Sequence, residues 1–156
     1  MMDLSDLLSS EAVLPSVHAQ SKKQVLQEVS ATAARLTGLA EREIFDTLLQ
    51  RERLGSTGVG QGVAIPHGKS AALDRLFGVF AKLARPVEFD SVDDQPVDLI
   101  FVLLAPESAG ADHLKALARV ARVLRDPEMA EKLRGAENAD AIFAILTTPA
   151  AASHAA

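Results

Sequence analysis

The chain contains no cysteine, tyrosine or tryptophan, and phenylalanine occurs only six times. Without thiols, a disulfide framework, a thiolate nucleophile and a thiolate zinc site are all excluded, which is compatible with a reducing compartment. So few aromatic rings leave little to stack on bases, and a net charge of −5 offers no broad cationic field for phosphate backbones. We therefore expect no nucleic-acid partner, and the chemistry must come from His, Asp, Glu, Arg, Lys, Ser or Thr.

Long apolar runs are also missing. The best stretch, Val97 to Ala105, is nine positions long and includes Asp98, whereas a membrane span needs about 18 or more apolar residues. The N-terminus carries Asp3 and Asp6 where a secretory signal would carry basic residues. We expect a cytoplasmic protein without membrane insertion, built as one domain over residues 1–148 with a disordered C-terminal tail over residues 149–156.

The N-terminal half has two helical patterns. A capping-box pattern begins at Ser21, and apolar residues then recur at helical spacing until Gly38. A second helix is expected from Ala40 or Glu41 to Arg51–Arg53, just before Gly55.

Four short apolar runs follow, separated by prolines, and predict strands over residues 63–65, 77–83, 87–89 and 97–104. The last is almost continuously apolar, which is typical of a central strand covered on both faces. Asn138 is expected to cap a last helix through Leu146, and Asp112 to cap a helix with a buried stripe of Leu114, Leu117, Ala118, Ala121 and Leu124. This order predicts an α/β fold, a single domain with a mixed β-sheet flanked by helices on both faces.

Glycine is concentrated before the first of these strands, with four glycines in the eight positions from Gly55 to Gly62. Such a segment is typical of a loop whose amides approach an anion, although a plain surface turn is an equal alternative. The later Gly68-Lys69-Ser70 resembles the end of a nucleotide-binding P-loop. That motif fails by count, because its first glycine would have to stand where Val63 does.

His67 lies between Pro66 and Gly68, at the end of the expected strand 63–65. A histidine that accepts a phosphoryl group needs one unprotonated ring nitrogen, an acceptor that holds the other nitrogen, and cationic or amide donors for the developing charge. Arg51, the glycine-loop amides and Lys69 could supply those donors.

His113 falls in the first turn of an expected helix, where free amides favour an anion. It could donate a hydrogen bond to a phosphate, or it could be an ordinary surface histidine. A metal site built from His67, His113 and Asp112 or Asp74 lacks ligand spacing, and we expect neither a metal nor another cofactor.

These residues together resemble the IIA phosphocarriers of the bacterial phosphotransferase system, in the mannitol, fructose and nitrogen-regulatory class. The resemblance rests on Arg51-Glu52, on Gly55-Ser56-Thr57-Gly58-Val59-Gly60, on Ala64-Ile65-Pro66-His67-Gly68-Lys69, and on Val97-Asp98-Leu99 and His113-Leu114. Within that class, the Gly-Ser-Thr-Gly-Val-Gly segment and a chain without a fused domain are most like the nitrogen-regulatory branch.

The resemblance implies roles for particular residues. It implies that His67 is the phosphorylated histidine, that His113 is a second active-site histidine, that Arg51 binds the phosphoryl group, and that a phosphate loop lies beside them, with Gly55, Ser56, Thr57, Gly58 and Gly60. It assigns no role to Lys69.

The resemblance also implies partners. These are an HPr-like phosphocarrier (NPr) as phosphoryl donor, and regulatory targets such as potassium-transport or sensor-kinase systems. Two alternatives stay open: a sugar-specific IIA component that passes the phosphoryl group to a IIB domain, and a purely regulatory binding module.

Overall fold

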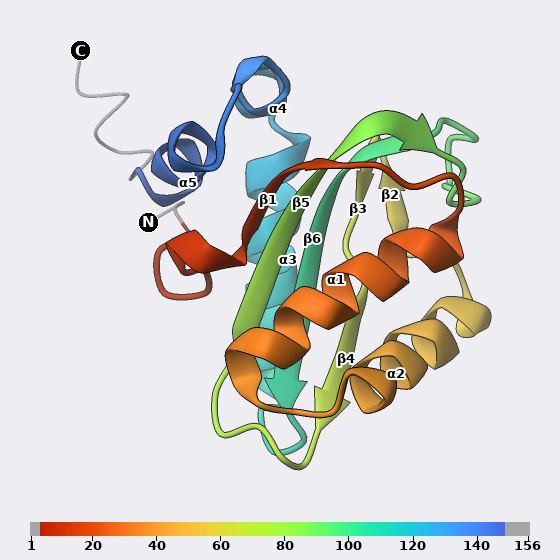
Figure 1. Ribbon diagram of the computed structural model, residues 1–156, viewed down its shortest axis with the longest axis vertical. Helices are drawn as coiled ribbons and strands as arrows, with labels where there is room; N and C mark the ends of the chain where they lie inside the picture. The colour runs from red at the N-terminus through yellow and green to blue at the C-terminus, as the bar shows by residue number, and fades with distance from the viewer. Residues whose placement is uncertain (1–3, 149–156) are drawn as a thin grey trace.

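A mixed β-sheet forms the centre of the protein in the computed structural model, which describes residues 4–148 (Figure 1). Within that range the six strands are β1 (Val13–Val17), β2 (Gly58–Gly60), β3 (Val63–Ala64), β4 (His67–Ser70), β5 (Phe77–Val87) and β6 (Val97–Pro106). They follow the order β1-β5-β6-β3-β2, and β4 pairs with β6 as well. The pairs β1–β5, β3–β6 and β4–β6 are parallel, whereas β5–β6 and β2–β3 are antiparallel.

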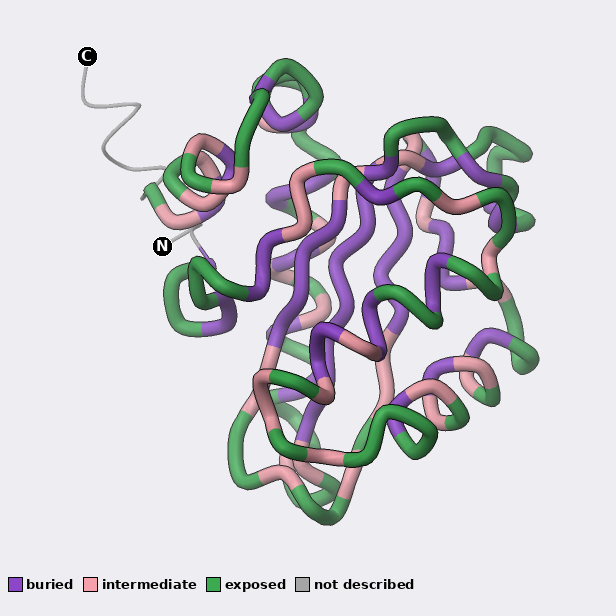
Figure 2. Tube along the Cα trace, viewed as in Figure 1, coloured by how far each residue is buried: buried purple, intermediate pink, exposed green. Residues whose placement is uncertain are grey.

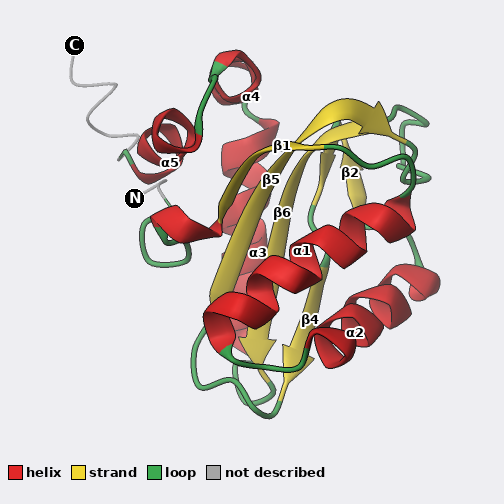
Figure 3. Ribbon diagram, viewed as in Figure 1, coloured by secondary structure: helices red, strands yellow, loops and turns green. Residues whose placement is uncertain are grey.

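Helices cover both faces of this sheet (Figure 3). They are α1 (Lys22–Thr37), α2 (Glu41–Leu54), α3 (Ala111–Arg125), α4 (Pro127–Gly135) and α5 (Ala139–Thr147), with a short 3-10 helix, η1 (Ser10–Ala12). In Figure 1, α1 and α2 lie on one face, α3 lies behind the sheet, and α5 lies beyond β1. The predicted α/β fold with a mixed sheet between helical layers is thus confirmed. No helix between residues 4 and 148 is both long and apolar enough to cross a bilayer.

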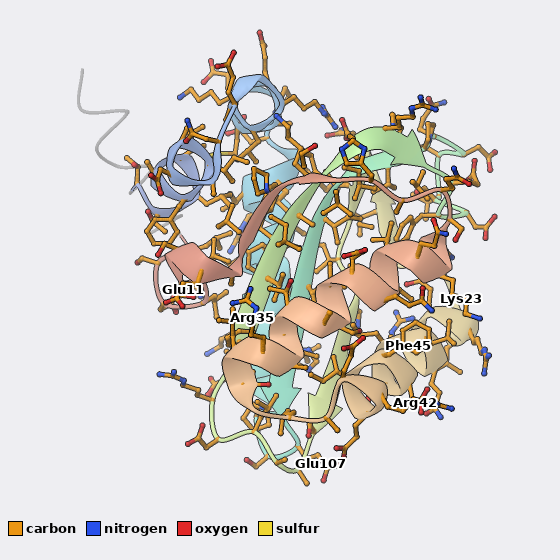
Figure 4. The ribbon with its side chains drawn as sticks, in the orientation of Figure 1. Glu11, Lys23, Arg35, Arg42, Phe45 and Glu107 are labelled. Atoms are coloured by element: carbon orange, nitrogen blue, oxygen red, sulfur yellow. The ribbon has the colours of Figure 1, made fainter. Side chains whose placement is uncertain are left out.

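The core follows the sheet (Figure 2). Strand β6 is buried from Leu99 to Ala105, which confirms the prediction of a central strand covered on both faces. Phe45 on α2 packs against this core, and Figure 4 shows its ring directed toward α1.

The predicted helix caps are confirmed at both ends of the chain. The Ser21 hydroxyl accepts from the amide of Gln24, and Gly38 ends α1 in the left-handed region, with φ of 80°. At the other end, Asn138 accepts from the amide of Ala141 and starts α5. The expected tail over residues 149–156 lies outside the described residues.

Helix α3 differs from the prediction. It starts after Gly110, so Asp112 lies inside the first turn and is not the N-cap. The predicted stripe is wrong at two positions, because Leu114 is 68% exposed and Ala118 is exposed, whereas Leu117 and Ala121 are partly buried against the core. Only Leu124 of the predicted stripe is fully buried, and the helix instead buries His113, Ala116, Val120 and Val123.

The strand boundaries also differ. Residues 77–83 and 87 form one strand, β5, and not two, while Phe89 lies beyond its end. Pro86 is tolerated there because the pairing of β5 with β6 is irregular between Lys82 and Val87. Strands β1, β2 and β4 and helix α4 were not predicted. Pro15 obscures the pattern of β1, an edge strand. Helix α4 begins at Pro127, and its N-cap is Asp126, whose side chain accepts from the amide of Glu128.

Candidate active site

The site begins at a break between two short strands. Strands β3 and β4 pair one after the other with β6, where Ala64 lies opposite Ile100 and His67 opposite Leu103. Pro66 lies in the break because it has no amide to donate, but its carbonyl still accepts from Leu103 at 2.9 Å. The sequence predicted that His67 lies at the end of strand 63–65. It is instead the first residue of β4.

The imidazole of His67 is held in one tautomer. Its Nδ1 lies 2.8 Å from the carbonyl oxygen of Ile65. Because a carbonyl oxygen can only accept, Nδ1 carries the hydrogen in this contact. Nε2 is then left with a free lone pair, and it accepts from Nε of Arg51 at 3.2 Å. One ring nitrogen is fixed and the other is unprotonated, which is the arrangement that a nucleophilic imidazole needs.

Arg51 connects α2 to this histidine. It lies in the last turn of α2, and its Nη1 also donates to the carbonyl oxygen of Gly55 at 2.8 Å. The guanidinium thus contacts both the imidazole and the segment that follows α2. This places a permanent positive charge directly beside Nε2 of His67.

His113 comes from the other face of the sheet and completes the site. Its ring centroid lies 5.7 Å from that of His67, and the two rings are inclined at 72°. The residue is 6% exposed, so the alternative of a surface histidine at a helix start is wrong. Its Nε2 is buried and has no hydrogen-bond partner among residues 4–148. An unpaired polar atom in such a place is costly and indicates a missing partner.

Both histidines are biased toward the neutral form. Burial lowers the pKa of His67 below its ordinary value of 6.5, and the charge of Arg51 adds to this, while the Ile65 carbonyl and Glu52 act in the opposite direction. Burial also lowers the pKa of His113, helped by the nearby His67 and Lys69. At neutral pH the lone pair on Nε2 of His67 is therefore available.

Three amides of the glycine-rich segment already have hydrogen-bond acceptors within the protein. The amide of Gly55 donates to the Glu52 carbonyl, that of Thr57 to the Glu52 carboxylate, and that of Gly58 to the Ser56 hydroxyl. The Ser56 hydroxyl itself donates to the carbonyl of Phe89. These three amides are not free to cradle an anion, so the segment supports the site by its shape.

Only part of the predicted phosphate loop lies at the histidine. Gly55 contacts Arg51, and the carbonyl of Thr57 accepts from Ile65. Gly58 and Gly60 instead form β2, which pairs with β3 and leads away from β4. Gly60 has a φ of 97°, and a side chain there would lie 3.4 Å from the carboxylate of Asp93.

The remaining candidates are placed as follows. His67 and His113 come together, but no group of three or more His, Asp or Glu side chains within residues 4–148 is arranged to hold a metal ion. His18 is exposed and lies beside Ala19, Gln20 and Arg85, apart from the site. Lys69 is exposed on β4.

Comparison with known proteins agrees with this fold. Residues 6–148 match the family model described as "Phosphoenolpyruvate-dependent sugar phosphotransferase system, EIIA 2". The chain belongs to this type-2 IIA family of the phosphotransferase system, as the motifs around His67 predicted.

Within the family the chain is similar to nitrogen regulatory proteins. It is 59% identical to one from Bradyrhizobium diazoefficiens over 96% of this chain and 98% of the relative, and 42% identical to one from Escherichia coli over 94% and 90%. The crystal structure of the nitrogen regulatory protein IIA-Ntr from Neisseria meningitidis superposes with a TM-score of 0.86 at 38% identity, covering 91% of this chain and 97% of that one. The predicted likeness to the nitrogen-regulatory branch is confirmed.

Proposed function

We propose that this protein is a phosphoryl carrier of the nitrogen-related phosphotransferase system, which accepts a phosphoryl group on Nε2 of His67 from an HPr-like phosphocarrier. The observation that carries the proposal is the tautomer of His67. The hydrogen bond from Nδ1 to Ile65 leaves the Nε2 lone pair as the nucleophile. Membership of the IIA family supports the same chemistry.

The transfer is an in-line displacement at phosphorus. The bond from phosphorus to the donor's histidine breaks, its electron pair returns to the donor nitrogen, and a new bond forms between phosphorus and Nε2 of His67. No proton has to leave His67, because Nδ1 keeps its hydrogen on the carbonyl of Ile65. The positive charge on the phosphorylated ring then lies against that carbonyl, which offsets it.

Two side chains can stabilise the negative charge of the phosphoryl oxygens by donating hydrogen bonds to them. Arg51 now donates to Nε2, and as the new bond forms this donation passes to a phosphoryl oxygen. The buried Nε2 of His113, which has no hydrogen-bond partner in the described part of the chain, can donate to a second oxygen when it carries the hydrogen. The chain thus supplies both the nucleophile and the donors for the transferred group.

The output of this carrier is regulatory. The phosphoryl group adds negative charge at a site that otherwise presents Arg51 and the exposed Lys69, so a partner can distinguish the two states by local electrostatics. We propose NPr as the donor, and potassium-transport or sensor-kinase systems as the class of target. The cytoplasmic location expected from the sequence is part of this proposal.

The first test is phosphorylation of the wild type, His67→Ala and His18→Ala with phosphoenolpyruvate, enzyme I and an HPr-like carrier, followed by intact-mass spectrometry. We expect one acid-labile phosphoryl group on the wild type and on His18→Ala, and none on His67→Ala. The exposed His18 is the matched control, because it has the same side chain outside the site. An acid-labile phosphoryl group on folded His67→Ala would refute the assignment.

The two alternatives give different results in extended versions of this assay. A sugar-specific IIA component would pass its phosphoryl group to a IIB domain at a useful rate, which we do not expect. A pure binding module would remain unphosphorylated with a donor that charges another acceptor.

A further inference from the structure

We propose that the buried carboxylate of Glu52 is a positioning residue that fixes the reactive tautomer of His67 through Thr57 and Ile65. Glu52 touches neither imidazole nor guanidinium in the contacts of this site. The proposal rests on the function proposed for His67, and it concerns how this chain keeps that histidine ready.

Glu52 is an acidic side chain in an unusual place. It is 6% exposed in the last turn of α2, and buried carboxylates are rare unless they are paired. Its partners come from two separate parts of the chain. The amide and hydroxyl of Thr57 donate to it at 2.9 and 2.6 Å, and Nζ of Lys22 at the start of α1 donates at 3.1 Å.

The Lys22 ammonium is itself held in place. It lies 5.3 Å from the centre of the Phe89 ring and 3.6 Å from the carboxylate of the exposed Asp90. The buried carboxylate accepts three hydrogen bonds, and the cation that donates one of them is held by Phe89 and Asp90 as well. The carboxylate is therefore a fixed point where α1, α2 and the glycine-rich segment meet. Such a network restricts the positions of the groups bonded to it.

An unbroken series of hydrogen bonds leads from this point to His67. Thr57 donates its amide to Glu52, and its carbonyl accepts from the amide of Ile65 at 3.0 Å. The carbonyl of Ile65 then accepts from Nδ1 of His67 at 2.8 Å. Each residue in the series is fixed on one side by the bond before it, so the carbonyl that selects the tautomer is placed by the carboxylate.

Arg51 is placed by the same residue from the other direction. The main-chain carbonyl of Glu52 accepts from Gly55 at 3.2 Å, and Gly55 in turn accepts from Arg51. The Glu52 carboxylate therefore places the acceptor on Nδ1, while the main chain of the same residue, which Glu52→Gln leaves intact, holds the segment that anchors the donor on Nε2. A change at Glu52 should affect the imidazole even though the two side chains do not touch.

The test uses Glu52→Gln, which keeps the size of the side chain but loses its charge and one acceptor. Nitrogen-15 NMR of the unphosphorylated protein reads the tautomer of His67 directly and needs no donor. We expect Glu52→Gln to shift His67 from a single Nδ1–H tautomer to a mixture of both. Phosphoryl transfer should slow by about 10- to 100-fold, the size of effect seen when a metal-ligating histidine loses the outer group that orients it.

Two controls separate positioning from loss of stability. Glu131→Gln makes the same change on an exposed residue of α4, and Ile142→Val removes one buried methylene-sized group on α5, away from the site. Both should keep the wild-type tautomer and rate, although Ile142→Val should unfold at a lower temperature. A folded Glu52→Gln with the wild-type tautomer and rate would overturn the proposal.

Thr57→Val provides a second variant if Glu52→Gln does not fold. It removes the hydroxyl that donates to Glu52 and keeps the shape and the main-chain amide. We expect a smaller shift of the tautomer in the same direction, and no shift would overturn the proposal. If the wild type itself takes up no phosphoryl group, the proposed function fails, whereas the tautomer measurement still decides the role of Glu52.

Discussion

The contact between α2 and β4 should control how well Arg51 reaches His67, and Gly68→Ala is designed to disturb it. A methyl group at Gly68 would lie 2.5 Å from Cγ2 of Thr47 on α2, well inside any normal contact. Thr47 cannot easily turn away, because its hydroxyl donates to the carbonyl of Glu43. The helix must therefore move away from the strand.

The size of the effect follows from two opposing terms. Overpacking of this kind costs about 1–3 kcal/mol, while alanine in place of glycine in a strand recovers about 0.5–1 kcal/mol. The net loss is about 0–2.5 kcal/mol, and its midpoint of about 1.25 kcal/mol should lower the unfolding temperature by roughly 2.5–5 °C for a chain of this size. The displaced Arg51 should lower the phosphorylation rate by more than about tenfold, because small errors of placement are expensive in catalysis.

The double variant Gly68→Ala, Thr47→Ser makes the prediction specific. Serine lacks Cγ2, and the next atom of residue 47, its Cβ, lies at 3.7 Å, which is ordinary contact. Rate and unfolding temperature should both return to near wild type. Gly135→Ala is the matched glycine control, because a methyl group there meets nothing within 4 Å.

The wild type, Gly68→Ala, the double variant and Gly135→Ala are compared by phosphorylation rate and thermal unfolding. If Gly68→Ala is as active and as stable as the wild type, the contact between α2 and β4 does not set the geometry of the site. If Thr47→Ser fails to restore the double variant, the clash with Cγ2 is not the cause of the loss.

Two further predictions concern the histidines. His113→Ala should slow phosphorylation of His67 without preventing it, because His113 only donates a hydrogen bond to a phosphoryl oxygen and is not the nucleophile. An unchanged rate in single-turnover assays would argue against this role. Because burial lowers the pKa of both His67 and His113 below 6.5, transfer should fall as pH falls through their folded pKa values. The stability that the two neutral histidines contribute is fully present above about pH 6.5, the unfolded pKa. It should be lost as pH falls through their folded pKa values, because the unfolded chain binds protons more readily there. Transfer rates and unfolding free energies measured between about pH 4.5 and 8, a range that spans the ordinary histidine pKa, test both expected decreases. A rise in transfer rate on acidification would contradict the prediction.

Local sequence signals predicted the elements whose ends are decided locally. Ser21 and Gly38 delimit α1 through bonds within a few residues, and Asn138 starts α5 in the same way. The nearly continuous apolar run of β6 likewise indicated a strand covered on both faces. In each case the information lies within one short stretch of chain.

Signals failed where distant residues decide the structure. Strand β4 consists of His67-Gly68-Lys69-Ser70, which has little β propensity, and exists because it pairs in parallel with β6. His113 is buried because it faces His67, whereas periodicity favoured the apolar but exposed Leu114. The burial of Glu52 depends on Lys22, 30 positions away, and no local pattern indicates it.

The acceptor that fixes the tautomer of His67 belongs to the main chain of Ile65. A substitution at position 65 changes a buried side chain but leaves that oxygen in the polypeptide, so no replacement of the side chain alone can delete it. Mutational scanning at this position should therefore report how well each residue packs, and the choice of reactive nitrogen should persist in every variant that folds with the same backbone. Substitution at position 65 therefore cannot delete the acceptor of the imidazole, whereas the side chains of Arg51 and His113 can each be lost through a single codon.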